Sequence, residues 1–212
     1  DEHTSRGLGD VYKRQRYGNA FIWSDIDQRK LANAIATVNH DEMEDSVIEN
    51  ASKYSQRKSK NFWINHPKVL EDFMVIAKRV NKEAGWNYDI DAIEPLQYTE
   101  YSSEVQGHYD WHADQHPKPY DDGRVRKISF SILLNDEYTG GGFEIETGNP
   151  NQEIRTRTIV AGKSKKQLNE TTMQLPVGSG LFFQSSYFHR VLPVKTGLRK
   201  SLVGWVLGPK FK

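Results

Sequence analysis

The stretch Gly107–Asp114 concentrates side chains that could bind a metal ion. It holds two His-x-Asp pairs, His112 with Asp114 and His108 with Asp110, in a chain that has only seven histidines. A neutral imidazole and a carboxylate at this spacing can reach one ion together. The spacing alone does not say which pair binds, so the decision depends on what the rest of the chain supplies.

His189 is the candidate for a third ligand, because it follows an apolar strand, Gly180–Phe183, and a turn that would bring it to the mouth of a barrel. A lone histidine at such a place is more often structural than functional, so His189 needs support from other residues.

Arg199 gives that support. It lies inside the apolar strand Leu198–Trp205, where a position facing the lumen seldom holds arginine unless it binds an anion. Ser201, two residues on, points to the same face and can add a hydroxyl. A metal triad beside a buried cation suits a dicarboxylate co-substrate, since one end can chelate the metal while the other pairs with the guanidinium.

Composition narrows the class of protein and the kind of metal. The 29 Lys and Arg against 28 Asp and Glu leave a net charge of +1, which gives no electrostatic reason to expect nucleic acid or a membrane as partner. The lack of cysteine excludes disulfides and thiolate metal sites, and it favours iron or manganese over structural zinc. No apolar run approaches the roughly 18 residues that a membrane span requires, and no signal-peptide core opens the chain, so we expect a soluble cytoplasmic protein.

Two helices and many short strands are expected to position these side chains. Apolar spacing predicts helices over 25–39 and 67–84, and the second carries an apolar stripe from Val69 to Val80. Short strands rich in β-branched and aromatic residues are predicted at 17–23, 62–64, 91–101, 107–113, 126–135, 142–147, 172–176, 179–184 and 198–207. Helices followed by many short strands indicate the α+β class, with a double-stranded β-helix (a jelly-roll, cupin-like barrel) and the N-terminal helices packed on its outside.

Three segments lack such patterns. Residues 1–15 are polar and without periodicity, so we expect a disordered leader, and 9–15 resembles read-through of sequencing-adapter sequence, which would make it artefactual. Residues 40–60 are expected to form a solvated loop, with a substrate lid as the alternative. Residues 148–170 are expected to form a long, solvated hairpin excursion. With no internal repeat or clear linker, 16–212 is predicted to be a single domain.

Taken in order, the motifs between residues 93 and 208 resemble those of 2-oxoglutarate/Fe(II)-dependent dioxygenases of the prolyl 4-hydroxylase-like group, above all the small bacterial and bacteriophage members. The matching segments include a strand with a tyrosine ahead of the metal pair, the Gly/Tyr/His-x-Asp motif and a Gly-Gly turn. In chain order they are 93–101, 107–114, 126–135, 138–145, 176–183, 189–194 and 197–205. The ordered set is specific, although no single motif is.

The resemblance selects between the two His-x-Asp pairs. The family places an aromatic residue three positions before the ligand histidine, and Tyr109 holds that position for His112, whereas Val105 holds it for His108. The resemblance therefore implies three iron ligands: His112, Asp114 and His189.

The resemblance also implies how a co-substrate is bound. Arg199 should bind the distal carboxylate of 2-oxoglutarate, with Ser201 and a tyrosine assisting. Tyr101 is the first choice for that tyrosine and Tyr98 the second, while Leu133 stands where some relatives use a tyrosine. Activity would then require Fe(II), 2-oxoglutarate and O2, with ascorbate as a reductant.

Substrate contacts are predicted at several further positions. Trp205, six residues after Arg199, matches an aromatic that lines the pocket in relatives, and a Trp that packs the core is an equally good interpretation. His108 and Asp110 share strand parity with His112, so we expect them in the pocket or on the surface at a strand end. The other candidates are Tyr109, Trp111, Trp63, Arg124 and Tyr187.

The implied activity is hydroxylation of an unactivated C–H bond, first of all in a prolyl residue of a peptide or protein, with succinate and CO2 as co-products. Hydroxylation of a free amino acid or other small metabolite is the alternative. A nucleic-acid demethylase of related fold is disfavoured, because such enzymes place a second arginine where Trp205 stands. A non-catalytic jelly-roll module is a remote alternative, since all three ligands and Arg199 are present. The protein is expected to be a monomer or a homodimer.

Overall fold

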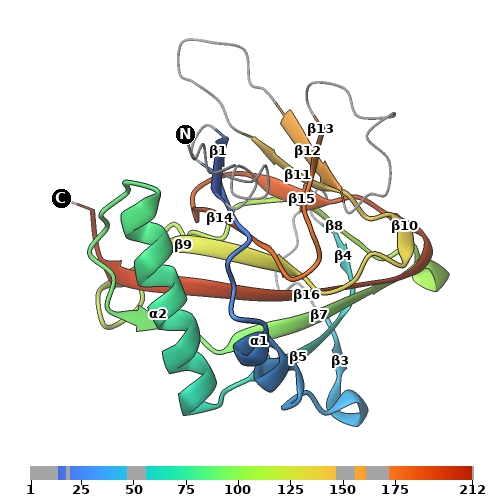
Figure 1. Ribbon diagram of the computed structural model, residues 1–212, viewed down its shortest axis with the longest axis horizontal. Helices are drawn as coiled ribbons and strands as arrows, with labels where there is room; N and C mark the ends of the chain where they lie inside the picture. The colour runs from blue at the N-terminus through green and yellow to red at the C-terminus, as the bar shows by residue number, and fades with distance from the viewer. Residues whose placement is uncertain (1–13, 18–19, 47–55, 147–155, 161–171, 212) are drawn as a thin grey trace, which may run out of the picture.

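The computed structural model describes residues 14–17, 20–46, 56–146, 156–160 and 172–211, and their strands form two sheets (Figure 1). The large sheet has the order β1 (Arg14–Tyr17), β2 (Ala20–Trp23), β14 (Gly180–Gln184), β9 (Arg124–Leu133), β16 (Val194–Pro209), β7 (Leu96–Ser102), β5 (Lys60–Ile64) and β3 (Glu44–Asp45). Two short strands, β6 (Ala92–Ile93) and β10 (Tyr138–Gly140), also pair with β16. The small sheet has the order β13 (Thr172–Gln174), β12 (Thr156–Val160), β11 (Phe143–Glu146), β15 (His189–Val191), β8 (His108–His112) and β4 (Arg57–Lys58).

The pairings at the centre of both sheets are antiparallel. The two sheets pack on each other as in a double-stranded β-helix, and the helices cover the outer face of the large sheet (Figure 1). The predicted α+β class and barrel are therefore confirmed.

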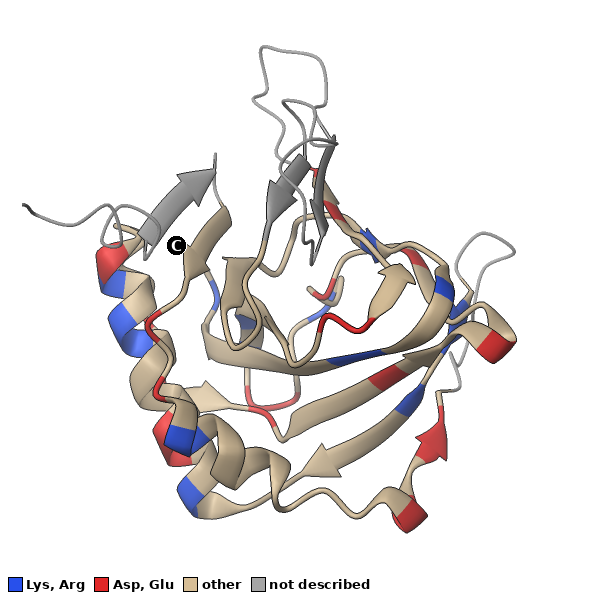
Figure 2. Ribbon diagram, turned by 45° about the vertical axis from the view of Figure 1, so that its right-hand side comes forward, with Lys and Arg blue, Asp and Glu red and all other residues tan. Residues whose placement is uncertain are grey.

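Two helices, α1 (Gln28–Ile35) and α2 (Pro67–Glu83), cover that outer face. Helix α2 begins with Pro67, whose fixed φ suits a first helical position, and its apolar stripe is buried as predicted. Phe73 of this stripe stacks on Phe130 of β9, with ring centroids 6.0 Å apart. Each such fully buried side chain contributes about 1.5–3 kcal/mol. Basic and acidic residues are interspersed along the exposed sides of the helices (Figure 2), in keeping with the small net charge.

Strand β16 shows how the large sheet separates its two faces. Leu202 and Val206 belong to the core under the helices, whereas Arg199, Ser201 and Trp205 point to the space between the sheets. Because side chains alternate along a strand, one face can pack apolar residues while the other presents polar groups. The polar face is the one that lines the candidate site.

The predicted boundaries differ from the structure at several places. The first helix ends at Ile35 rather than 39, because the side chain of Asn39 caps a separate 3₁₀ turn by accepting from the N–H of Asp41. The predicted strand 91–101 is divided into β6 and β7, with Pro95 in the break. Strand β16 is longer than predicted, running from Val194 to Pro209.

Several short elements were not predicted. Within the predicted loop 40–60, the described residues form a 3₁₀ turn, His40–Glu42, and strands β3 and β4. Strands β10 and β15 were also missed, and Arg14 and Gln15 of the predicted leader pair with β2. Residues 1–13 and 47–55 lie outside the described residues, as does most of the predicted excursion 148–170, of which 156–160 forms β12. Neither helix in the described part of the chain is long and apolar enough to cross a bilayer.

Candidate metal and co-substrate site

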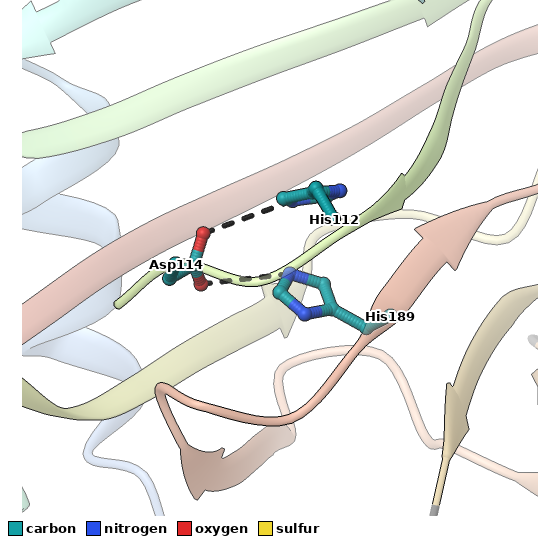
Figure 3. Close-up of side chains that lie close together, drawn as sticks. All are labelled: His112, Asp114 and His189. Carbon is teal, nitrogen blue, oxygen red and sulfur yellow. Dashed lines mark ion pairs between the residues drawn. The ribbon is translucent and has the colours of Figure 1, made fainter. Parts of the chain in front are cut away.

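Three side chains from β8, the segment that follows it and β15 converge between the sheets. Nε2 of His112 lies 3.7 Å from Oδ1 of Asp114, and Nε2 of His189 lies 3.5 Å from Oδ2. Figure 3 shows the carboxylate turned toward both imidazoles. One donor atom from each residue lies within 4.8 Å of the other two, so a single metal ion could contact all three. We call this set the ligand triad.

Backbone carbonyls orient both imidazoles of the triad. Nδ1 of His112 lies 2.8 Å from the carbonyl oxygen of Asp110, and Nδ1 of His189 lies 3.0 Å from that of Tyr187. Because a carbonyl only accepts, each Nδ1 carries a proton, which leaves Nε2 as the nitrogen that could bind a metal ion. Burial and the neighbouring His189 lower the pKa of His112 to about 3, so this imidazole is neutral at pH 7.

Asp114 supplies the negative charge of the triad. Burial alone would raise the pKa of its carboxyl, but His189, His112 and Arg126 together hold that pKa below its ordinary value. Its backbone N–H donates to the carbonyl of Ser185 over 3.0 Å, which ties the carboxylate to the turn before His189. The donor set of two imidazoles and one carboxylate suits a non-haem iron(II) ion.

A β-bulge in β8 decides which side chains accompany His112 into the space between the sheets. His112 pairs with His189 and Tyr109 with Val191, so three residue steps of β8 span two of β15. The extra residue reverses the alternation of side chains along β8. Tyr109 therefore lies on the face of His112, and its ring stacks on the imidazole with centroids 3.5 Å apart.

The bulge makes the predicted shared parity of His108 and Asp110 with His112 wrong. His108 contacts the carbonyl of Gln106, and Asp110 accepts from the backbone N–H of Gln56 over 2.9 Å. Neither side chain lines the cavity that contains the ligand triad. The choice of the pair that includes His112 thus agrees with the geometry, and His108 is removed as a substrate contact.

Arg199 is buried in the same cavity, with 3% of its surface exposed. Its Nη1 donates to Oγ of Ser201 over 3.2 Å, and the hydroxyl of Tyr138 lies close enough to the guanidinium for Arg199 to oppose the rise that burial causes in the pKa of that tyrosine. Its Nε has no hydrogen-bond partner among the described residues. A buried guanidinium without a carboxylate partner in the described chain could bind an anion, and we call this place the candidate anion site.

Of the two tyrosines that were predicted to assist Arg199, the structure places only Tyr101 beside it. Tyr101 lies directly opposite Arg199 in the β7–β16 register, and its ring centroid is 5.5 Å from the guanidinium carbon. Tyr98 lies opposite Leu202, packs in the core under the helices and donates to Glu100. Because alternate residues of a strand face opposite ways, Tyr98 cannot reach the candidate anion site, and that choice of tyrosine is corrected.

Tyr138 is a further residue beside Arg199, and the sequence analysis did not assign it to the site. Its hydroxyl lies at the guanidinium, and although burial raises the pKa of Tyr138, Arg199 opposes that rise. Gly141 makes the approach possible: its φ is +61°, and a Cβ there would lie 3.0 Å from both Arg199 Cδ and the Tyr138 ring. The Gly-Gly turn was recognised as a motif, and the tyrosine two residues before it was the available signal.

The ligand triad and Arg199 line one cavity of about 210 Å³. Trp63 and Trp205 lie on its lining with ring centroids 5.9 Å apart, and Trp63 is 48% exposed where the cavity meets solvent. The indole N–H of Trp205 is buried without a partner among the described residues. Both tryptophans therefore remain candidates for substrate contact.

Arg126, rather than the predicted Arg124, lines the cavity. A second bulge, at Lys127 of β9, turns Arg126 to the inner face, where its guanidinium lies 4.3 Å from the Trp205 ring centroid. Its Nε donates to Glu94 over 2.7 Å, and this pairing raises its pKa although burial would lower it.

The other predicted substrate contacts lie outside the cavity. Arg124 pairs with Asp91 and Asp122 at the surface, at 2.9 and 2.8 Å. Trp111 lies under the guanidinium of Arg190, at 4.7 Å. Tyr187 packs against the core between the sheets, and its carbonyl orients His189. None of the three lines the cavity of the ligand triad.

Comparison with known proteins identifies the family. The family model described as the 2OG-Fe(II) oxygenase superfamily matches residues 96–207, which is just over half of the chain and contains the ligand triad and Arg199. The chain belongs to the 2OG-Fe(II) oxygenase superfamily.

Curated relatives and solved structures agree with this membership. Two PKHD-type hydroxylases from Synechococcus sp. strains CC9902 and CC9605 are 30% and 33% identical over 106 and 100 residues, or 49% and 46% of this chain. The chain covers only 38% and 36% of the length of these two relatives.

The solved structures show the same fold. A Pseudomonas putida prolyl-4-hydroxylase has a TM-score of 0.59 at 17% identity, covering 91% of this chain and 94% of its own. A Trichoplax adhaerens prolyl hydroxylase in complex with a hypoxia inducible factor peptide has a TM-score of 0.56 at 19% identity, covering 89% and 83%. At these identities the likeness extends to the fold alone.

The described residues fit both groups in the superfamily's name. The ligand triad offers two imidazole nitrogens and one carboxylate for iron(II), and Arg199 offers a guanidinium whose Nε–H has no partner among the described residues for the distal carboxylate of 2-oxoglutarate. The two sites line one cavity, so a single dicarboxylate could occupy both.

The ligand triad predicts which substitutions remove the metal. Replacing His112, Asp114 or His189 by Ala should weaken Fe(II) binding at least about 100-fold, because losing even a hydrogen-bond partner of a ligand costs roughly 10- to 100-fold. Anaerobic titration with Fe(II) or Co(II) measures this. His108→Ala is the matched control and should bind like the unmodified protein; loss of metal in His108→Ala alone would contradict the assignment.

The hydroxyl of Tyr138 should contribute to 2-oxoglutarate binding. Tyr138→Phe should weaken it about tenfold, because one hydrogen bond to a charged group contributes about 1.5 kcal/mol. Calorimetry on the metal-loaded protein measures the affinity, with Tyr98→Phe as the control on the opposite face of the sheet. Pyruvate, which lacks the distal carboxylate, should bind both variants equally; an equal loss for pyruvate would place the hydroxyl elsewhere.

Proposed function

We propose that this protein is a 2-oxoglutarate- and Fe(II)-dependent dioxygenase that hydroxylates a prolyl residue in a peptide or protein. His112, Asp114 and His189 hold the iron, and Arg199, Ser201 and the two tyrosines 101 and 138 hold the distal carboxylate of 2-oxoglutarate. The observation that carries the proposal is the buried guanidinium of Arg199, without a carboxylate partner in the described chain, in the same cavity as the ligand triad.

When bound, iron and 2-oxoglutarate supply the oxidation: O2 adds one oxygen atom to a substrate C–H bond and one to succinate, with release of CO2. The chain's own residues position these groups. Carbonyl contacts and the stacked ring of Tyr109 fix His112, while Phe143 stacks on His189 with centroids 5.4 Å apart. These rings cover one side of each imidazole, and the other side faces the cavity in which iron and 2-oxoglutarate would lie.

A prolyl substrate is supported by three observations of different kinds. The PKHD-type relatives are named hydroxylases, and the structural neighbours include prolyl hydroxylases, one of them bound to a peptide. In this chain, Trp63 and Trp205 offer two aromatic surfaces at the cavity lining, a type of surface on which proline-rich peptides dock. Trp205 also occupies the position six residues after Arg199, where a second arginine would be expected for a nucleic-acid demethylase.

The test is a substrate screen with two controls, omission of Fe(II) and a variant of the ligand triad. Proline-containing peptides incubated with the protein, Fe(II), 2-oxoglutarate and O2 should gain one oxygen atom by mass spectrometry, with succinate formed in equal amount. Omitting Fe(II), or replacing His189 by Ala, should abolish both products. Product from free amino acids alone would replace the peptide proposal by the small-metabolite alternative, and Fe(II)-independent product would contradict the ligand triad.

A further inference from the structure

Arg57 of β4 lines the same cavity as the ligand triad, and it is not among the residues proposed above to bind iron or 2-oxoglutarate. Its guanidinium is anchored by three neutral acceptors: Nε donates to Ser59 over 2.8 Å, and Nη2 donates to Asn61 over 2.9 Å and to Gln97 over 2.7 Å. These three acceptors are 8%, 8% and 3% exposed. The Nη1 group donates no hydrogen bond to any described residue.

This anchoring fixes the guanidinium in one orientation. Its carbon lies 4.8 Å from the ring centroid of Tyr109, the ring that stacks on His112. The three acceptors are buried but Arg57 itself is only half-buried, and its Nη1 edge, which donates to no described residue, is left available to a ligand in the cavity. An arginine held by neutral groups with one free edge is prepared for a planar anion.

The balance of charges in the cavity distinguishes Arg57 from the other two arginines that line it, Arg126 and Arg199. Iron(II) and Arg199 together offset the dianion 2-oxoglutarate and the carboxylate of Asp114, so that complex is neutral. The charge of Arg126 is offset by Glu94, to which it donates over 2.7 Å. Among the described residues that line the cavity, Arg57 is then the cation without a counter-charge.

The position of Arg57 separates it from the site of 2-oxoglutarate. Gln97, to which Arg57 donates, lies opposite Val203, whereas Tyr101 lies opposite Arg199. Val203 is four residues beyond Arg199 on β16, which corresponds to about 13 Å along the strand. A five-carbon dicarboxylate that joins the ligand triad to Arg199 cannot also reach this second position.

We propose that Arg57 binds a carboxylate of the substrate, so that the protein selects substrates with an acidic group close to the hydroxylated carbon. The inference rests on the proposed function and deepens it. The carboxylate could belong to an acidic side chain or to the C-terminus of a peptide, or to a free amino acid, and the three sources share one chemistry.

Three pairs of probes separate the sources: Ac-Ala-Pro-Glu-NH2 against Ac-Ala-Pro-Gln-NH2, Ac-Ala-Pro-OH against Ac-Ala-Pro-NH2, and proline against prolinamide. Binding to the protein loaded with Mn(II) and 2-oxoglutarate is measured by calorimetry, and hydroxylation with Fe(II) by mass gain. In at least one pair the acidic member should bind about 30-fold more tightly, because an unscreened charge pair inside a cavity has roughly that effect.

Substitution tests whether Arg57 causes the preference. Arg57→Gln should reduce binding of the acidic member to the level of its amide and leave the amide unchanged, while Arg57→Lys should restore part of the preference. Arg124→Gln, at a surface arginine outside the cavity, is the matched control and should retain it. 2-Oxoglutarate affinity should not change in any of the three variants.

The outcomes for binding and turnover are distinguishable. Charge-dependent binding through Arg57 without hydroxylation would keep the carboxylate site and overturn the proposed function. Hydroxylation without a charge preference would keep the proposed function and overturn the carboxylate site at Arg57. No preference in any pair, no binding of any probe, or an Arg57→Gln variant that weakens both members of a pair equally would overturn the carboxylate site.

Discussion

The candidate site depends on the pairing of β8 with β15. This pairing, within the small sheet, sets His112 directly opposite His189, although the two residues lie far apart in the sequence. The turn before β15 extends the constraint, because the Ser185 carbonyl accepts from the N–H groups of Asp114 and Gln115 at 3.0 and 2.9 Å. Two backbone segments therefore fix three donor side chains before any metal is bound. Such preorganisation reduces the conformational entropy lost on metal binding.

The inner face of the large sheet is unusually polar for a buried surface, which reduces its contribution to stability. The outer face compensates for this with apolar packing. Arg199, Ser201 and Ser129 are 3% exposed or less on the inner face. The outer face carries a continuous apolar core against α1 and α2, and this core supplies most of the hydrophobic stabilisation. The division follows from strand alternation, so the same strands serve stability on one side and binding on the other.

Sequence patterns predicted the fold and singled out Arg199 as a candidate anion-binding residue, whereas the ligand triad was chosen through the family resemblance. The apolar stripe of α2 and the alternation of β16 are visible in the sequence, and Arg199 is conspicuous inside an apolar strand. Patterns failed where the alternation itself is interrupted. The bulge in β8 puts His108, which was expected to share a face with His112, on the other face, and the bulge at Lys127 of β9 turns Arg126, which was not predicted as a site residue, to the inner face.

Other misses have a different cause. Arg57 lies on a two-residue strand next to residues with little apolar content, where no periodicity exists to be read. Tyr138 precedes a Gly-Gly turn whose positive φ angles at Gly140 and Gly141 fold the chain against Arg199, a contact that only the three-dimensional structure reveals.

The central claim is that one ion and one dicarboxylate occupy the cavity together, between the ligand triad and Arg199. The most direct test is a crystal structure of the protein with Mn(II) and 2-oxoglutarate, with the metal located by its anomalous scattering. The account predicts one metal ion in contact with His112, Asp114 and His189, and a distal carboxylate at Arg199 with the Tyr138 hydroxyl beside it. A metal ion at His108 and Asp110, or a ligand carboxylate away from Arg199, would contradict it.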